Sequence, residues 1–285
     1  MTNIIFFGSS EYSVIILKKI LEINDFHVSA VVSKIDKPAG RSQKITPNPV
    51  ASFAKQQNLI LLQIENFDDN CKLKIENLKP DLGLCVAFGP PYFDQEMIDI
   101  PKYKIVNIHP SPLPKYRGAT PGPWQIINGE TKSAITFFQI DTLPDHGPII
   151  SQIPFDITPT ETAITFYNKA FNLAASNLVA ILESYILNPE SLTPQDHTQK
   201  SYFPKFDKDS AQINWAWDNE KIDRFVRALI PWPIAWTYVV NLQGQKLKMK
   251  IFSYNTQPIE VQIEGKQRTL WSEISKYYSI DKPKI

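Results

Sequence analysis

Asn107 and His109 stand two residues apart, where an apolar segment opens into the loop NIHPSPLPKYRGATPGP. If a strand continues through both, their side chains point to the same side of a sheet and converge on one substrate atom. An amide and an imidazole at this spacing suit a shared carbonyl oxygen, although a lone strand-end histidine is a weak signal by itself. Ser111, Pro112 and Pro114 stiffen the loop, which lowers the ordering cost of binding a ligand.

The elements that position this pair alternate between strand and helix patterns. Apolar runs predict strands at Asn3–Phe7, His27–Val32, Leu82–Phe88, Lys104–Ile108, Ser133–Ile140 and Ile149–Ile157. Helical spacing predicts helices at Ser13–Glu22, Pro49–Gln57 and Thr160–Leu187. This alternation predicts an α/β fold with a Rossmann-like, mostly parallel sheet and flanking helices. Ligands of such sheets bind beyond the carboxyl ends of the strands, where Asn107 and His109 lie.

A chain of 285 residues predicts a large domain followed by a small one. Pro189, Pro194 and Pro204 stand among polar residues and give a linker composition. We therefore expect a domain at 1–188, a linker at 189–206 and a second domain at 207–285. The second domain shows one helical segment and short β-rich segments, namely Asp218–Leu229, Trp236–Asn241, Lys246–Tyr254 and Ile259–Ile263.

Composition argues against several classes of protein. With 43% hydrophobic and 21% charged residues, the chain shows no apolar run that we would assign to a bilayer, and MTNIIFFGSS lacks the features of a signal peptide. We expect a cytoplasmic protein without membrane contact. Two cysteines, Cys71 and Cys85, make no disulfide framework, and Cys85 in an apolar run is expected to be a buried thiol. Four histidines without close pairing predict no metal site.

The formal net charge of +1 does not indicate a nucleic-acid partner, so any such partner requires local asymmetry. A loop rich in proline holds five cations against Asp36, namely Lys34, Lys37, Arg41, Lys44 and Lys55. Lys246, Lys248 and Lys250 alternate with apolar residues, which places three ammonium groups on one face of a strand. On charge alone, lysines that simply face the solvent explain both patterns better than contact with a nucleic acid does.

The string NIHPSPLPKYRGATP resembles the signature loop of the tetrahydrofolate-dependent formyltransferases, Asn-x-His-Pro-Ser-Leu-Leu-Pro followed by Arg-Gly. Those enzymes carry an acidic residue in an Asp-x-Gly pattern before a later strand, which Asp145-His146-Gly147 matches. Three further segments resemble the methionyl-tRNA formyltransferase family, namely IIFFGSSEYSVIILKKI, SKIDKPAGRSQKITPNPVASFAKQ and IDRFVRALIPWPIAWT.

The resemblance implies that Asn107, His109 and Asp145 transfer a formyl group from N10-formyltetrahydrofolate to initiator methionyl-tRNA. A protonated His109 would stabilise the charge that develops on the formyl oxygen and help to protonate the departing folate nitrogen, while Asn107 orients the carbonyl. Asp145 would favour the charged imidazole and accept, through water, the proton that the amine loses.

The same resemblance implies the binding residues, and we expect a monomer. It assigns the folate to Phe88, Gly89, Pro90, Ser111, Pro112, Leu113 and Pro114. It assigns the tRNA to a basic insertion with Lys37, Arg41 and Lys44, and we add Lys246, Lys248 and Lys250 of the second domain. That domain is expected to be a small β-barrel of the oligonucleotide-binding (OB) kind.

Three departures from the family pattern stand out. Pro112 replaces the usual Leu, and His146 replaces a residue that is commonly Thr. The closing segment VQIEGKQRTLWSEISKYYS follows too soon to leave room for the usual strands, so we expect a shortened barrel with an open edge.

Other polar and aromatic residues keep two interpretations. Arg224 and Arg227 either meet phosphate or cover an apolar interface, and Trp232 and Trp236 are either barrel core or a base-stacking platform. His27 and His197 are expected to be structural or solvated.

Three alternative functions remain open on the sequence. A formyltransferase acting on a nucleotide-linked amino sugar would keep Asn107, His109 and Asp145 but needs a nucleotide pocket in place of the basic insertion. A formyltetrahydrofolate hydrolase would carry a regulatory domain before the catalytic one. A non-enzymatic tRNA-binding protein is suggested only by the short tail.

Overall fold

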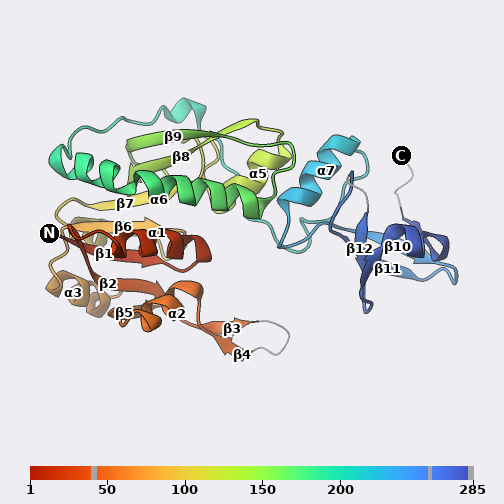
Figure 1. Cartoon of the computed structure of the whole chain (residues 1–285), viewed down its shortest axis with the longest axis horizontal. Helices are drawn as coiled ribbons and strands as arrows, with labels where there is room; N and C mark the ends of the chain where they lie inside the picture. The colour runs from red at the N-terminus through yellow and green to blue at the C-terminus, as the bar shows by residue number, and fades with distance from the viewer. Residues whose placement is uncertain (40–43, 256–258, 282–285) are drawn as a thin grey trace. The chain divides into compact units, whose positions relative to one another are not determined.

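The computed structural model describes residues 1–39, 44–255 and 259–281 (Figure 1). The chain forms two compact units, and each is assembled from separate stretches of sequence. The first comprises Met1–Arg117, Ala134–Phe155 and Asn168–Tyr202, and the second comprises Gly118–Ser133, Asp156–Tyr167 and Phe203–Ile285. The expected division into 1–188, 189–206 and 207–285 concerns independently folding domains and stays a prediction.

A seven-stranded sheet forms the centre of the first unit, in the order β5-β2-β1-β6-β7-β8-β9 (Figure 1). Its strands are β1 (Thr2–Gly8), β2 (Phe26–Lys34), β5 (Leu61–Ile64), β6 (Leu82–Val86), β7 (Ile105–His109), β8 (Lys132–Gln139) and β9 (Ile149–Asp156). All pairs from β5 through β7 are parallel, and β8 runs antiparallel to β7. The predicted α/β class with a mostly parallel sheet is confirmed.

Helices cover both faces of this sheet and begin at polar caps. They are α1 (Glu11–Leu21), α2 (Pro49–Gln56), α3 (Asp69–Asn77), α4 (Gln95–Asp99) and α6 (Ala163–Leu187). The Ser10 hydroxyl accepts a hydrogen bond from the Ser13 backbone, so a capping box starts α1. Tyr12 of α1 stacks on Phe171 of α6 over one face. On the other face, residues of α3 and α4 pack into a core cluster with Phe7.

The order of the strands reverses between β1 and β6. The chain runs from β1 outward through β2 and β5, and then returns to place β6 on the other side of β1. In an open α/β sheet such a switch point opens a crevice at the carboxyl ends of the strands. Ala87 and Gly89, directly after β6, have positive φ of 44° and 71°, which ends the strand and turns the chain there.

Helix α6 is long and apolar enough to cross a membrane by length and composition alone, which corrects the expectation that no segment of that kind exists. Its buried side chains include Phe171, Leu178 and Leu182, which are at most 2% exposed. Core helices of globular proteins pass the same test, so the length of α6 is weak evidence for a membrane span.

The second unit carries a five-stranded antiparallel sheet in the order β13-β12-β11-β10-β14. Its elements are α5 (Pro121–Ile127), α7 (Asn219–Ala228), β10 (Trp236–Asn241), β11 (Lys246–Ile251), β12 (Glu260–Ile263), β13 (Arg268–Leu270), α8 (Trp271–Ile274) and β14 (Tyr278–Ile280). Among the described residues β13 and β14 are the edges, as expected for a shortened barrel. Trp236 is core at 6% exposure, whereas Trp232 is 51% exposed.

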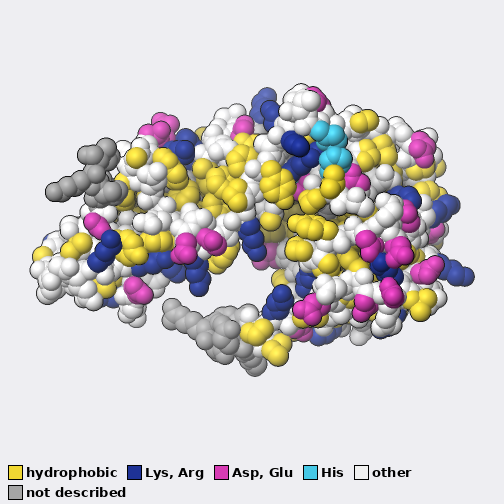
Figure 2. Space-filling model, turned by 180° about the vertical axis from the view of Figure 1, so that it is seen from behind, with side chains coloured by type: hydrophobic (Ala, Val, Ile, Leu, Met, Phe, Trp, Pro, Cys, Tyr) yellow, Lys and Arg dark blue, Asp and Glu magenta, His cyan; other side chains and the backbone are white. Residues whose placement is uncertain are grey.

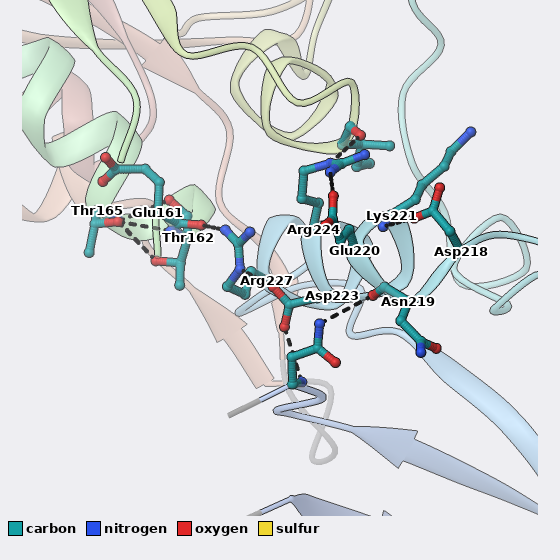
Figure 3. Close-up of polar contacts among 12 residues, drawn as sticks. Glu161, Thr162, Thr165, Asp218, Asn219, Glu220, Lys221, Asp223, Arg224 and Arg227 are labelled. Carbon is teal, nitrogen blue, oxygen red and sulfur yellow. Dashed lines mark hydrogen bonds and ion pairs between the residues drawn. The ribbon is translucent and has the colours of Figure 1, made fainter. Parts of the chain in front are cut away.

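Arginines of α7 hold the helices of the second unit together (Figure 3). Arg224 Nε donates to the Ile127 carbonyl at 3.1 Å, which satisfies a carbonyl at the C-terminus of α5. Arg227 Nε donates to Asp223 Oδ2 at 2.8 Å, and its Nη1 donates to the Glu161 carbonyl. Both guanidinium groups are thus engaged within the protein, which favours the structural interpretation over phosphate binding.

Candidate active site

His109 ends strand β7 with its side chain buried, and each ring nitrogen faces an oxygen of the protein. Nε2 lies 3.0 Å from the Tyr116 carbonyl oxygen, and Nδ1 lies 3.6 Å from Asp145 Oδ1. A carbonyl can only accept, so Nε2 carries a hydrogen and donates it. Nδ1 therefore carries a hydrogen only when the ring is charged, and a charged ring then faces a carboxylate. The structure brings His109 and Asp145 together as predicted from the sequence motifs.

Asn107 lies on the same strand, two residues before His109, and its side chain is half-buried. Its amide has no hydrogen bond to any residue that the structure describes, which leaves donor and acceptor for a substrate. The neighbouring residue across the sheet is Cys85 of β6. Burial raises the pKa of the Cys85 thiol to about 12, so this buried free cysteine is an inert core residue, as predicted.

The loop after β7 is braced from strands β8 and β9. Thr136 Oγ1 donates to the Ser111 carbonyl at 2.6 Å, and Gln152 Nε2 donates to the Leu113 carbonyl at 2.7 Å. Ser111 Oγ donates a hydrogen bond to the Lys115 carbonyl at 2.8 Å. The side chains of Ser111 and Leu113 are buried, whereas Pro112 and Pro114 are partly exposed. The loop is therefore rigid, and its prolines rather than Ser111 face the solvent.

Asp145 lies in a tight turn that the Asp-x-Gly pattern makes possible. Its φ is +52°, in the left-handed region. A Cβ atom on Gly147 would lie 1.9 Å from the Gln139 carbonyl oxygen, so no other residue fits the close approach of this turn to the end of β8. The glycine thus fixes the path of the backbone that presents Asp145.

Two polar residues that we did not assign to the site hold this turn. Gln195 Nε2 donates to the carbonyls of Asp145 and Gly147 at 3.1 and 2.7 Å, and Arg117 Nη2 donates to Gln195 Oε1 at 2.6 Å. Burial lowers the pKa of the Arg117 guanidinium, and the charges of Asp145 and Asp141 oppose that shift. Arg117 is the arginine of the Arg-Gly in the signature motif, so the sequence did point to this residue. Gln195 lies in the expected linker, where no pattern pointed to it.

A pair of imidazoles lies beside these residues. The rings of His146 and His197 stack at 4.0 Å with an interplanar angle of 7°. His146 Nδ1 is 2.5 Å from Asp141 Oδ2, and His197 Nδ1 accepts from Arg117 Nη2 at 2.8 Å. Desolvation, followed by the neighbouring His146 and Arg117, lowers the pKa of His197. Figure 2 shows imidazole side chains adjacent at the surface, next to a cationic side chain. His197 is thus part of the surroundings of the site.

The loop after β6 presents backbone rather than side chains. The Phe88 ring is 4% exposed and packs with Phe7, Phe67 and Phe93. Gly89 and Pro90 are exposed, and a Cβ on Gly89 would meet nothing within 4 Å.

Lys34, at the end of β2, faces the same loop. Its Nζ lies 4.0 Å from the centre of the Phe88 ring and 3.4 Å from the Gly89 carbonyl. Burial lowers the pKa of Lys34 to about 8. The sequence placed Lys34 among the basic loop residues but gave no sign of this contact.

The residues expected to meet tRNA are described only in part. Lys37 is exposed on β3 (Lys37–Ala39), which pairs antiparallel with β4 (Lys44–Thr46), so the base of the basic insertion is a two-stranded ribbon rather than the irregular loop that we expected. Arg41 and the side chain of Lys44 lie outside the described residues.

Strand β11 has one apolar and one cationic face, as its alternation predicted. Met249 and Ile251 are buried, and the three lysines Lys246, Lys248 and Lys250 are not. Lys246 lies over the Tyr238 ring at 4.2 Å, and Lys248 lies over the Trp236 ring at 3.5 Å. An ion pair with Asp281 at 2.8 Å already occupies Lys246.

Metal ligands and cavities are the remaining features that could form a site. Within the described ranges no group of three or more His, Cys, Asp or Glu side chains could hold a metal ion. A cavity of about 470 Å³ opens in the second unit, where Leu242, Ile263, Lys266 and Tyr277 line it. Its lining contains no carboxylate or imidazole, and its titratable side chains are those of Lys266, Tyr277 and Tyr278.

Comparison with known proteins places the chain among formyl-transferring enzymes. A family described as formyl transferase matches residues 2–182, and the formyl transferase C-terminal domain matches residues 205–275. The methionyl-tRNA formyltransferase of Alkaliphilus oremlandii is 35% identical over 248 residues, which make up 87% of this chain and 78% of that protein.

Two solved structures share the fold. The methionyl-tRNA formyltransferase from Clostridium thermocellum gives a TM-score of 0.58 at 17% identity and covers 92% of this chain and 99% of its own. A sugar 3N-formyl transferase, solved in the presence of dTDP and 5-N-formyl-THF, gives 0.63 at 20% identity and covers 94% and 99%.

Proposed function

The chain belongs to the formyl transferase family, and we propose that it transfers the formyl group of N10-formyltetrahydrofolate to the amino group of methionyl-tRNA. The observation that carries the chemistry is the end of β7, where the Asn107 amide, unbonded among the described residues, lies on the same strand as a histidine that faces the Asp145 carboxylate. The relatives that are named for methionyl-tRNA support the choice of acceptor.

The donor fits the carboxyl edge of the sheet. When bound, it would supply a carbonyl carbon attached to a nitrogen leaving group. The exposed backbone of Gly89 and Pro90 and the partly exposed Pro112 and Pro114 offer it a rigid surface. Phe88, Ser111 and Leu113 would act through their backbone, because their side chains are buried.

Asn107 and His109 would act on the formyl oxygen. Attack by the amine places negative charge on that oxygen, and a preorganised donor there lowers the barrier by about 2.7 to 4 kcal/mol. The Asn107 amide has no hydrogen bond within the described part of the chain that it would have to break before making this one. Nδ1 is the atom of His109 left for the reaction, because Nε2 donates to Tyr116.

Asp145 would stabilise the positive charge of the His109 ring and accept the proton that the amine loses. Its Oδ1 is too far from Nδ1 for a direct hydrogen bond at 3.6 Å but near enough to stabilise a charged imidazole. A water molecule between the amine and this carboxylate would carry away the proton that the amine loses on forming the amide. The departing folate nitrogen would take its proton from His109.

The acceptor would be held by cations outside this centre. Lys37 and its neighbours Arg41 and Lys44 in the insertion, with Lys246, Lys248 and Lys250 on β11, are proposed to meet phosphates of the tRNA. We further propose that the enzyme acts in the cytoplasm, because its relatives are named for methionyl-tRNA, and that it acts as a monomer.

The test is a transfer assay. Purified protein is incubated with N10-formyltetrahydrofolate and methionyl-tRNA, and methionine released from the tRNA is examined for a formyl group. Formylmethionine supports the proposal. Absence of transfer, together with transfer to a dTDP-linked amino sugar, would replace the acceptor with the sugar class.

The division of roles between chemistry and tRNA binding is tested with His109→Ala. Loss of the imidazole is expected to lower kcat by about 100- to 10,000-fold, while the Kd for methionyl-tRNA, measured by filter binding, stays within twofold. A variant that loses both transfer and tRNA binding contradicts this separation.

A further inference from the structure

Gln195 and Arg117 join a distant segment to the turn that carries Asp145. Gln195 lies 50 residues from Asp145 and 78 from Arg117, yet both side chains are 6% exposed or less. One amide group makes three bonds: its Nε2 donates to the carbonyls of Asp145 and Gly147, and its Oε1 accepts from Arg117. Only a primary amide offers two donors and an acceptor at one end.

The Arg117 side chain is not arranged for maximum stability. Its Nε is buried without a hydrogen-bond partner among the described residues, and its Nη2 is shared between Gln195 and His197. A buried cation is costly unless its donors are satisfied, so its retention here points to a task other than stabilising the fold. That task is to fix which end of the Gln195 amide faces the turn, because a guanidinium accepts no hydrogen bond and forces Oε1 towards itself.

We propose that Arg117 and Gln195 are positioning residues that hold the Asp145 turn (residues 145–147) at the distance from His109 that formyl transfer requires. Arg117 orients the amide of Gln195, and the amide fixes the two carbonyls that flank His146. The inference rests on the proposed function, since Asp145 is assigned to the transfer there. Displacement of a reacting group by 1 Å costs on the order of 100-fold in rate.

The first measurement is structural and independent of any substrate. Gln195→Met keeps the length of the side chain but removes all three bonds. Gln199→Leu removes an exposed glutamine of the same segment, whose side-chain hydrogen bond among the described residues goes to Asp196. In crystal structures of the variants, the Nδ1–Oδ1 distance between His109 and Asp145, 3.6 Å here, is expected to lengthen in Gln195→Met and to stay unchanged in Gln199→Leu. An unchanged distance in Gln195→Met overturns the proposal.

The second measurement separates positioning from simple stabilisation. With N10-formyltetrahydrofolate and methionyl-tRNA, Gln195→Met is expected to lower kcat by about 30- to 100-fold, with both KM values within threefold. In an Asp145→Asn background the same change is expected to have almost no further effect, because residues that act through one another are not additive. Equal losses in both backgrounds overturn the proposal.

A third variant tests the donors alone. Gln195→Glu keeps an acceptor for Arg117, and therefore the fold, but turns a carboxylate oxygen towards the carbonyls of Asp145 and Gly147. It is expected to be at least as slow as Gln195→Met, and wild-type kcat in this variant contradicts the proposed role. Wild-type protein that shows no transfer to methionyl-tRNA overturns the proposed function instead, while the crystallographic distance still decides the role of Gln195.

Discussion

Asn107 and His109 are both proposed to act on the formyl oxygen, but their side chains are held in different ways. The ring of His109 is held at Nε2 by Tyr116 and faces Asp145 with Nδ1, whereas the Asn107 amide has no partner in the described part of the chain. A side chain that is fixed before the substrate arrives loses little entropy on binding it. Asn107 gains its orientation from the strand, and His109 gains it from the loop that follows.

The unbonded amide gives a prediction for Asn107. Asn107→Ala is expected to lower kcat by about 100- to 1,000-fold, the usual effect of removing one donor to a developing oxyanion. The KM for methionyl-tRNA is expected to change by less than threefold, because this residue is not among the tRNA contacts. Steady-state kinetics on both substrates checks the two values, and a kcat within fivefold of wild type would remove Asn107 from the mechanism.

Lys34 gives a prediction about pH and stability. Its pKa falls from the ordinary 10.5 to about 8 in the folded protein, foremost because of burial. Between these values the unfolded chain binds more protons than the folded one, so this residue makes the free energy of unfolding rise with pH through that window. Below pH 8 both states are protonated, and the full penalty of burying the charge is present.

Urea unfolding of wild type and Lys34→Met at pH 7, 8, 9 and 10 measures this contribution. The difference between the two proteins isolates Lys34, because the raised pKa of Cys85 acts in the opposite direction in both of them. The gain of wild type relative to the variant is expected to grow steadily above pH 8. Parallel curves for the two proteins would refute the assignment.

At the scale of elements, the sequence predicted those whose residues carry a regular apolar pattern. Apart from β5, the strands of the seven-stranded sheet and the long helices α1 and α6 lie within a few residues of the expected ranges. Strand β6 ends at Val86 rather than Phe88, because positive φ at Ala87 turns the chain. Helix α6 begins at Ala163, after Thr162 accepts a hydrogen bond from the Thr165 backbone.

The elements that were missed lack that pattern. Helix α3 reads DNCKLKIEN and buries only Cys71 and Ile75, so its start depends on the Asp68 cap rather than on an apolar stripe. Helix α5 reads PGPWQII, whose proline and glycine indicate a loop. Strand β5 has four residues. In these segments tertiary contacts decide the structure.

The residues of the candidate site also divide into those that the sequence indicated and those that it did not. Asn107 and His109 are indicated by their spacing at a strand end and Asp145 by the family resemblance, and the structure places His109 Nδ1 3.6 Å from Asp145 Oδ1. Gln195 could not be predicted, because its partners are brought to it by the fold and no spacing in the sequence records their approach. His197 was set aside for the same reason.

The cationic face of β11 gives a prediction at this scale. The triple variant Lys246→Gln, Lys248→Gln, Lys250→Gln is expected to raise the Kd for methionyl-tRNA by about tenfold at low salt. Its kcat at saturating tRNA is expected to stay unchanged. Lys74→Gln, an exposed lysine of α3, is the control and is expected to bind as wild type does. Filter binding measures both, and an unchanged Kd in the triple variant would exclude this face from the tRNA contacts.

The whole molecule is nearly neutral, with 30 basic residues against 29 acidic ones. A polyanion such as tRNA is therefore not attracted by the overall field, and binding must depend on a few local phosphate contacts. This differs from strongly basic RNA-binding proteins, in which the net charge itself contributes to encounter.

A small number of phosphate contacts predicts that the KM for methionyl-tRNA depends only moderately on salt concentration. The KM for methionyl-tRNA is expected to rise by about 10- to 50-fold between 50 and 200 mM salt, the effect of two or three phosphate contacts, if only some of the six proposed cations meet phosphate at one time. A rise of about 1,000-fold or more would indicate that all six do so. The KM for N10-formyltetrahydrofolate, a small co-substrate, is expected to change by less than threefold. A tRNA KM that does not respond to salt would contradict binding through lysine and arginine.

The close approach at Gly147 has a consequence for anyone who wishes to alter this enzyme. Position 147 admits no side chain, because its Cβ would overlap the Gln139 carbonyl oxygen, so libraries that vary it will contain mainly misfolded members. Position 146 is different, because its side chain points to His197 at the surface. Randomising 146 while keeping 147 and 197 fixed offers a way to adjust the charge near the carboxylate without moving it, because His197 is bonded to Arg117.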